Sequence, residues 1–251
     1  MQMLAVFLVA LRTLWGFRAV VACLIGTLLP LTLLTVTREA VFASDFSLWS
    51  DTLRISPFSS TAHAYIGRED AEKRGRIDEG IAEFKKALEI NPYDFTTHSN
   101  LGFAFFQTGH VDEAITEYHK ALEIYPTLIN AHTNLGAALM QKGQFDEAMA
   151  QFQKILEIRP DNSDAHANWG NALLQKGEVE EAIVHYQKAL EINPNNANAR
   201  NDLGAAFFKK GQLDEAVAQF QEALRLNPDS TDARNNLRNV QAIAGQRARQ
   251  K

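Results

Sequence analysis

The sequence repeats itself every 34 residues through most of its length. The clearest copy is residues 129–162, INAHTNLGAALMQKGQFDEAMAQFQKILEIRPDN, and its landmarks return on both sides of it. The recurring landmarks are Leu101-Gly102, Leu135-Gly136, Trp169-Gly170 and Leu203-Gly204, together with Pro126, Pro160, Pro194 and Pro228. A fixed period of this length predicts an array of stacked units, each of which buries its apolar face only against its neighbours.

Each unit reads as two amphipathic helices. Apolar residues recur at i, i+3 and i+4 in both halves, as Leu135, Ala138 and Leu139 and then as Ala148, Phe152, Ile155 and Leu156. We expect Gly143 to end the first helix in a tight turn and Pro160 to stop the second. Small residues at Gly136 and Ala148 predict a close approach of the two helices, with Phe152 filling the gap beside them.

With these residues at this spacing, the chain resembles the tetratricopeptide repeat (TPR) family over roughly residues 45–244. The resemblance implies a right-handed superhelix of antiparallel helix pairs. Its first helices would line a concave groove that holds an extended peptide or a partner's helix, and it implies no chemistry. We therefore predict an all-α fold, an α-α superhelix (TPR solenoid), preceded by a transmembrane helix.

The repeat divides the chain into nine predicted parts. They are a membrane segment (1–43), a half-repeat cap (44–60), an irregular first repeat (61–94), four regular repeats (95–128, 129–162, 163–196 and 197–230), a capping helix (231–244) and a basic tail (245–251).

The first repeat departs from the pattern by one residue. Gly67 and Gly75 are 8 positions apart, whereas Gly102 and Gly109 are 7 apart. In addition, REDAEKR replaces the apolar FAFFQT of the next repeat. We expect the first helix of this repeat to be bulged or poorly packed.

An uncharged stretch precedes the repeats. Residues 19–37 carry no charge, and as a helix at ~1.5 Å per residue they would span roughly 28 Å, close to the ~30 Å hydrocarbon core of a bilayer. This predicts a single membrane span. The alternative is a cleaved signal peptide with Val41-Phe42-Ala43 at its cleavage site, although a signal core is shorter, about 7–15 residues.

Basic residues flank this stretch unequally. Arg12 and Arg18 precede it, and Arg38 follows it beside Glu39. The positive-inside rule therefore places the repeats outside the cytoplasm.

The charge of the repeats bears on the class of partner. Residues 61–230 hold 16 basic and 26 acidic side chains, a net charge of −10, which is a poor match for a phosphate backbone. We therefore expect no nucleic-acid partner. Cys23 is the only cysteine, so no disulfide can form within the chain.

Two sets of recurring residues suggest chemistry at first. One is a histidine column, His63, His98, His132 and His166, and the other is a set of acidic pairs, Asp78-Glu79, Asp112-Glu113, Asp146-Glu147, Glu180-Glu181 and Asp214-Glu215. Histidines of successive repeats would lie ~8–10 Å apart, too far to share one zinc ion. The acidic pairs fall at helix starts, where the helix dipole favours them. We predict a packing role for the histidines and no catalytic residues, metal or cofactor.

An asparagine column is the better candidate for a site. It consists of Asn100, Asn134 and Asn168, continued by Asp202 and Asn236. In TPR proteins this position faces the groove, and in O-GlcNAc transferase-like arrays an asparagine ladder grips peptide backbone. A primary amide both donates and accepts hydrogen bonds, so it can bind a peptide unit of any sequence. The alternative is that these side chains are simply solvated.

Two further rows on the same helices are predicted to line or flank the groove. They are Phe106, Met140, Leu174 and Phe208, and the residues that follow them, Gln107, Gln141, Gln175 and Lys209. Gln107, Gln141 and Gln175 belong to the predicted partner-binding residues, together with the first row and the asparagine column. Such an amphipathic lining suits a peptide, and no small-molecule substrate is evident.

The sequence thus predicts a membrane-anchored TPR scaffold, not an enzyme, that binds a protein or peptide in its groove. The alternative is the C-terminal TPR part of a polytopic membrane glycosyltransferase of the O-mannosyl or O-GlcNAc transferase type. The junction SLWSDTLRISPFSSTAHAYIG resembles that of such enzymes.

Overall fold

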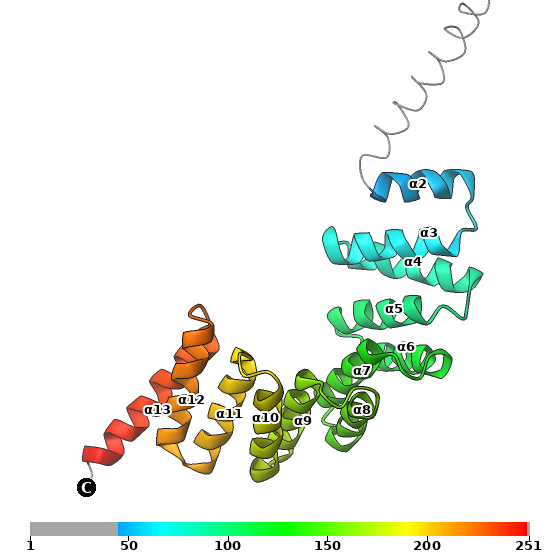
Figure 1. The fold of residues 1–251 in the computed structure, drawn as a ribbon. Helices are drawn as coiled ribbons and strands as arrows, with labels where there is room; N and C mark the ends of the chain where they lie inside the picture. The colour runs from blue at the N-terminus through cyan, green and yellow to red at the C-terminus, as the bar shows by residue number, and fades with distance from the viewer. Residues whose placement is uncertain (1–44, 250–251) are drawn as a thin grey trace, which may run out of the picture.

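The computed structural model describes residues 45–249. Within that range the chain forms twelve α-helices and one short π-helix, with no strand (Figure 1). The elements are α2 Asp45–Ile55, α3 Ser60–Arg68, the π-helix η1 Glu69–Lys73, α4 Ile77–Ile90, α5 Phe95–Gln107, α6 Val111–Ile124, α7 Ile129–Gln141, α8 Phe145–Ile158, α9 Ser163–Lys176, α10 Val179–Ile192, α11 Ala197–Lys210, α12 Leu213–Leu226 and α13 Thr231–Arg249.

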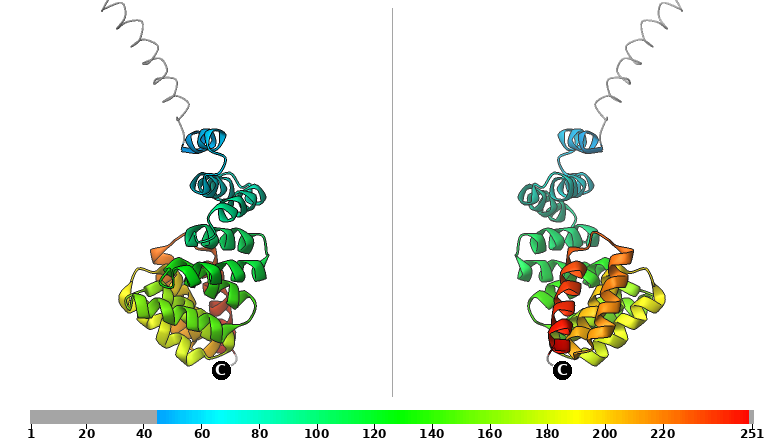
Figure 2. Two further views of the ribbon diagram at one scale, coloured as in Figure 1. Left: turned by 90° about the vertical axis from the view of Figure 1, so that its right-hand side faces the viewer. Right: turned by 90° about the vertical axis from the view of Figure 1, so that its left-hand side faces the viewer.

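The helices stack in chain order as antiparallel pairs. The second helix of each pair packs on the first helix of the next, and first helices of neighbouring repeats also touch, as α5 with α7, α9 with α11 and α11 with α13. The stack curves as it proceeds, so that α13 lies well away from the axis set by α2 to α5 (Figures 1 and 2). The predicted all-α superhelix is confirmed.

Local signals set the helix boundaries. The Asp94 carboxylate caps α5 by accepting hydrogen bonds from the backbone N–H groups of Thr96 and Thr97 at 3.0 and 3.2 Å. Gly143 adopts φ +75°, a left-handed conformation that glycine reaches without a Cβ penalty, and so turns the chain from α7 into α8.

One contact recurs in every repeat and holds its two helices together. An aromatic ring of the second helix lies against a glycine of the first, in the pairs Gly67–Phe84, Gly102–Tyr118, Gly136–Phe152, Gly170–Tyr186 and Gly204–Phe220. The rings are at most 1% exposed. A Cβ at Gly102 would lie 2.8 Å from a carbon of the Tyr118 ring, so an alanine cannot fit without moving the helices apart.

The extra residue of the first repeat is absorbed as a π-helix. Helix α3 runs directly into η1, Glu69–Lys73, which widens the turn by one residue, as the spacing of Gly67 and Gly75 predicted. The bulge turns Asp70 inward to 5% exposure, and its carboxylate pairs with Arg76.

Ion pairs link successive repeats along one edge of the stack. In three repeats, a carboxylate of the acidic pair that begins the second helix faces a lysine at the end of the first helix of the next repeat. The pairs are Asp112–Lys142 at 2.5 Å, Asp146–Lys176 at 2.7 Å and Glu180–Lys210 at 3.5 Å. Exposed pairs of this kind contribute little each, about 0–1 kcal/mol, but they repeat with the array.

The two ends of the array are covered by single helices. Helix α2 packs on α3, where Trp49 stacks on Tyr65 with ring centroids 5.3 Å apart. At the other end, α13 continues to Arg249, so ending the capping helix at 244 and placing a tail at 245–251 was wrong. Gln, Arg and Ala after Gly245 are good helix formers and carry the helix onward.

The predicted membrane span, residues 19–37, lies outside the described residues. Among residues 45–249, no helix has an apolar stretch long enough to cross a bilayer.

The Gly–aromatic contact yields a paired prediction, because two of its rings carry a hydroxyl. The Tyr186 hydroxyl donates to Asn171 Oδ1 at 2.7 Å, whereas the equally buried Tyr118 hydroxyl has no partner in the described part of the chain. Tyr118→Phe should raise the free energy of unfolding by about 1 kcal/mol, and Tyr186→Phe should lower it by about 1 kcal/mol. Urea denaturation followed by circular dichroism measures both, and shifts of the same sign would contradict the assignment.

Candidate functional site

The asparagine column lies along the first helices, and two concave cavities open onto it. The N-terminal cavity, of about 510 Å³, is formed by α5, α7 and the turn before α9. Its lining residues are Glu72, Ser99, Asn100, Phe103, Ile129, Asn130, Thr133, Asn134, Arg159, Asn162 and Asp164. It therefore brings together the first two members of the column, Asn100 and Asn134, both half-buried.

The C-terminal cavity, of about 600 Å³, continues along α9, α11 and the start of α13. Its lining residues are Thr133, Asp164, Ala167, Asn168, Asn171, Asn196, Asn198, Ala199, Asn201, Asp202, Ser230 and Asp232. Thr133 and Asp164 line both cavities, so the two form one continuous polar surface. Asn236, the last member of the column, reaches this surface by donating to Asn201 Oδ1 at 3.0 Å.

Several lining residues were missed from the sequence although a signal for them was present. Asn130, Asp164, Asn198 and Asp232 each precede a column residue by four positions, and Asn171 follows Asn168 by three. Residues three and four apart share one helix face, so helical spacing from the column would have found them.

The other two predicted rows lie outside both cavities. Phe106, Met140, Leu174 and Phe208 are six residues after the column, which turns them toward the core clusters against which they pack, partly buried. Gln107, Gln141 and Gln175 are seven residues after it and exposed, on the same face but two turns farther along. Lys209 donates to the Leu174 carbonyl at 2.8 Å.

Asp202 is the one charged member of the column, and a polar network surrounds it. Asn201 donates to its carboxylate at 3.2 Å, and Asn171, which accepts from Tyr186, also bonds to it. Burial raises the pKa of the Asp202 carboxyl above its ordinary value and Asp232 adds to the effect, although the bonds from Asn201 and Asn171 oppose it.

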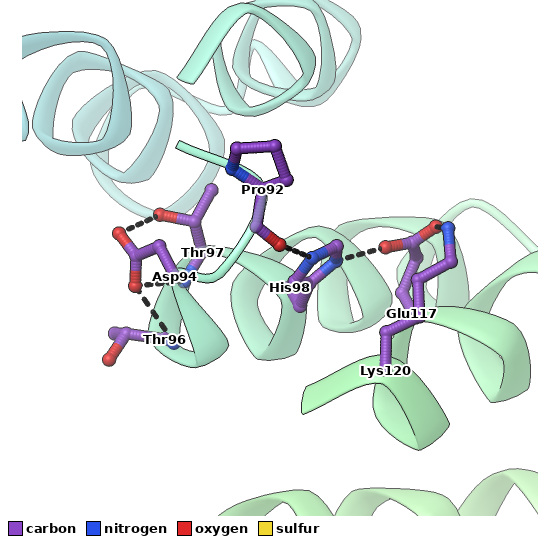
Figure 3. Close-up of polar contacts among 7 residues, drawn as sticks. All are labelled: Pro92, Asp94, Thr96, Thr97, His98, Glu117 and Lys120. Atoms are coloured by element: carbon purple, nitrogen blue, oxygen red, sulfur yellow. Dashed lines mark hydrogen bonds and ion pairs between the residues drawn. The ribbon is translucent and has the colours of Figure 1, made fainter. Parts of the chain in front are cut away.

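The histidine column occupies a different face, and in the first three repeats it fastens the helix pair to the turn before it. His98 Nε2 lies 3.0 Å from the Pro92 carbonyl and Nδ1 lies 2.6 Å from Glu117 Oε2, while Lys120 holds the other carboxylate oxygen (Figure 3). Both contacts of the ring are to acceptor oxygens.

The same bridge recurs along the array. His63 spans Glu83 and the Pro57 carbonyl, and His132 spans Gln151 and the Pro126 carbonyl. Arg200 takes this position in the last repeat, spanning Gln219 and the Pro194 carbonyl. His63, His98 and His132 are buried, as their predicted packing role requires, and the structure adds these hydrogen bonds.

In the fourth repeat the column histidine, His166, makes a different contact. Nδ1 of His166 lies 3.3 Å from Nδ1 of His185, and the His185 ring stacks on Trp169 with centroids 4.6 Å apart. Burial lowers the pKa of His185 to about 4, with further contributions from His166 and Lys188. Burial, and then Lys188, also lower the pKa of His166.

The comparisons with known proteins place this chain in a family. The sequence model for the TPR repeat matches residues 73–109, 104–143, 136–177, 170–211 and 204–242, well over half of the chain. The chain therefore belongs to the TPR family. A search of curated proteins finds no match.

Solved structures agree with this assignment. A crystal structure of MamA is 28% identical, with a TM-score of 0.60 over 67% of this chain and 92% of that one. YrrB is 19% identical, with a TM-score of 0.59 over 74% of this chain and 96% of that one. TTC0263 from Thermus thermophilus is 22% identical, with a TM-score of 0.60 over 73% of this chain and all of that one. The last two show the fold alone.

Asp202 offers a test of the groove's electrostatics. Its folded-state pKa is raised, so the folded protein holds the proton more tightly, and keeping the carboxylate charged costs stability above that pKa. Asp202→Asn should therefore stabilise the protein at pH 7, and the gain should vanish as the pH falls below the ordinary value of 3.8. Thermal unfolding at pH 7 and pH 3.5 measures this. Asp164→Asn, at an exposed position of the same cavity, is the control and should change little; a gain from Asp202→Asn that persists at pH 3.5 would exclude this cause.

Proposed function

We propose that this protein is a scaffold that binds an extended protein segment along the first helices, without catalysis of its own. The observation that carries the proposal is the continuous amide-rich surface of the two cavities, about 510 and 600 Å³, onto which Asn100, Asn134, Asn168 and Asp202 all open.

The chemistry of that surface suits a peptide backbone. Each peptide unit presents one N–H donor and one carbonyl acceptor, and a primary amide side chain can satisfy both. Neighbouring first helices lie ~10 Å apart, so the groove extends for about 30–40 Å and could hold ~9–12 residues at ~3.3 Å each. Amides at half-buried positions lose little conformational freedom on binding, which favours their use as a fixed row of contacts.

The relatives support the same class of function. YrrB is described as a TPR protein with an unusual peptide-binding site, and it shares this fold over 74% of the present chain. Peptide binding is thus a function that a protein of this fold can have. Our proposal extends that use to the amide column of this chain.

We further propose that residues 19–37 anchor the array to a membrane, with the repeats outside the cytoplasm. The support is the 19-residue uncharged stretch and the excess of basic residues before it, Arg12 and Arg18 against Arg38.

The groove is tested with a displayed library of random 12-residue peptides and the full chain as bait. Selected peptides should bind the wild type and lose about a hundredfold in affinity when Asn100, Asn134 and Asn168 are all changed to Ala. The reason is that each lost hydrogen bond removes about 0.5–1.5 kcal/mol. Fluorescence anisotropy of the labelled peptides measures the dissociation constants.

The matched control changes Gln107, Gln141 and Gln175 to Ala. It removes the same number of amides from the same three helices, but outside both cavities. It should leave the affinity nearly unchanged. A library that yields no binder, or peptides that bind the asparagine variant as well as wild type, would show that the column is not the site.

Topology is tested by reporter fusions after Lys251. A reporter active only outside the cytoplasm should be active, and one active only inside should be silent. Deleting residues 19–37 should reverse the pattern and move the protein from the membrane to the soluble fraction. The opposite pattern in the undeleted chain would refute the proposed side.

A further inference from the structure

The fourth repeat breaks the hydrogen-bonding rule that the other repeats follow. Opposite the bridging histidine or arginine, the second helix elsewhere carries an acceptor, namely Glu83, Glu117, Gln151 or Gln219. In the fourth repeat that position is His185 on α10, and it faces His166 on α9. Histidines of successive repeats would lie too far apart to share one metal ion, but His166 and His185 belong to the same repeat.

The distance between the two rings matches that between two ligands of one metal ion. Metal–nitrogen bonds of ~2.0–2.1 Å give a nitrogen–nitrogen separation of roughly 3.3–3.4 Å at a tetrahedral angle and roughly 2.9 Å at a right angle. The two Nδ1 atoms lie 3.3 Å apart. Both side chains are only half-buried, so an ion can reach them from solvent.

We propose that His166 and His185 form a binding site for a divalent transition-metal ion, Cu²⁺ in preference to Zn²⁺. Imidazole suits both ions, and Cu²⁺ binds more tightly to a given nitrogen site. Within residues 45–249, no group of three or more His, Cys, Asp or Glu side chains converges as a ligand set. The site therefore supplies two nitrogens, and water or a partner's group completes the coordination.

Binding requires a change of tautomer in one ring. In the metal-free pair, one Nδ1–H donates to the other Nδ1. For both Nδ1 lone pairs to reach the ion, that proton must leave Nδ1 and Nε2 of the same ring must take one up through water. Each ring stays neutral, so no net proton is released at pH 7. The lowered pKa values of both rings agree with this, because a neutral pair does not repel a cation.

Trp169 and Lys188 have opposite effects on metal binding at this pair. Trp169 stacks on His185 and fixes the plane of its ring. The positive charge of Lys188 acts on both histidines and weakens the attraction for a cation. Trp169 also supplies a reporter, because a paramagnetic ion on the stacked imidazole quenches indole fluorescence.

The decisive variant is His185→Gln, which reproduces the His132–Gln151 arrangement of the preceding repeat and so should keep the fold. The full chain is titrated with CuCl₂ at pH 7.4 and followed by Trp fluorescence and by electron paramagnetic resonance. The wild type should bind one Cu²⁺ through two imidazole nitrogens and quench Trp169. In His185→Gln the affinity should fall by about tenfold or more and the Trp169 quenching should disappear.

The converse variant places a second imidazole in the third repeat. Gln151→His faces His132 across the same helix pair, so it should create a second Cu²⁺ site of two nitrogens. Unchanged affinity and quenching in His185→Gln, or a wild-type spectrum showing one imidazole nitrogen, would overturn the proposal. If Gln151→His adds no Cu²⁺ site, two histidines facing each other across a helix pair of this array do not bind the ion, and the proposal fails.

Discussion

The contact of a glycine on one helix with an aromatic ring on the next is the constraint on which this structure depends. It occurs once per repeat, from Gly67–Phe84 to Gly204–Phe220, and leaves no space for a side-chain carbon on the glycine. Because the ring fills the space between two backbones, it sets how closely the two helices of each pair approach. Repeating one such pair accumulates a constant rotation per repeat, and that rotation makes the inner, concave surface of the array.

The first helix of each repeat makes a different kind of contact on each of three faces. One face buries Leu135 and its equivalents, a second carries the histidine bridge to the preceding turn, and a third opens the amide column to the groove. The bridge explains why a histidine or an arginine serves in a packing position, since each has a donor long enough to reach the proline carbonyl. In the fourth repeat the acceptor opposite His166 is a ring nitrogen of His185 in place of a carboxylate or amide oxygen.

Much of the fold could be predicted from particular residues. The period predicted the helix pairs, Gly143 predicted the turn, and the extra residue before Gly75 predicted a bulge, which the structure shows to be a π-helix; each depends on local geometry. The column from Asn100 to Asp202 was found for the same reason. The rows led by Phe106 and by Gln107 are six and seven residues farther along the helix. The first row therefore packs on the core and the second lies two turns away, and neither lines the two cavities. The capping helix was predicted to end at 244, but α13 continues to Arg249, because a single glycine at 245 costs a helix only about 1 kcal/mol.

The sequence by itself determined the repeat, the helix pairs and the residues that each helix turns inward, because these follow from a 34-residue period combined with helical spacing. It also determined the candidate column of amides. Only the tertiary structure decided that these amides share one surface with Asn171 and Asn201, that Asp202 is buried within a network, and that His166 meets His185. Those facts depend on distances between residues of different helices, which are set by how the glycine and aromatic contacts bring the helices together.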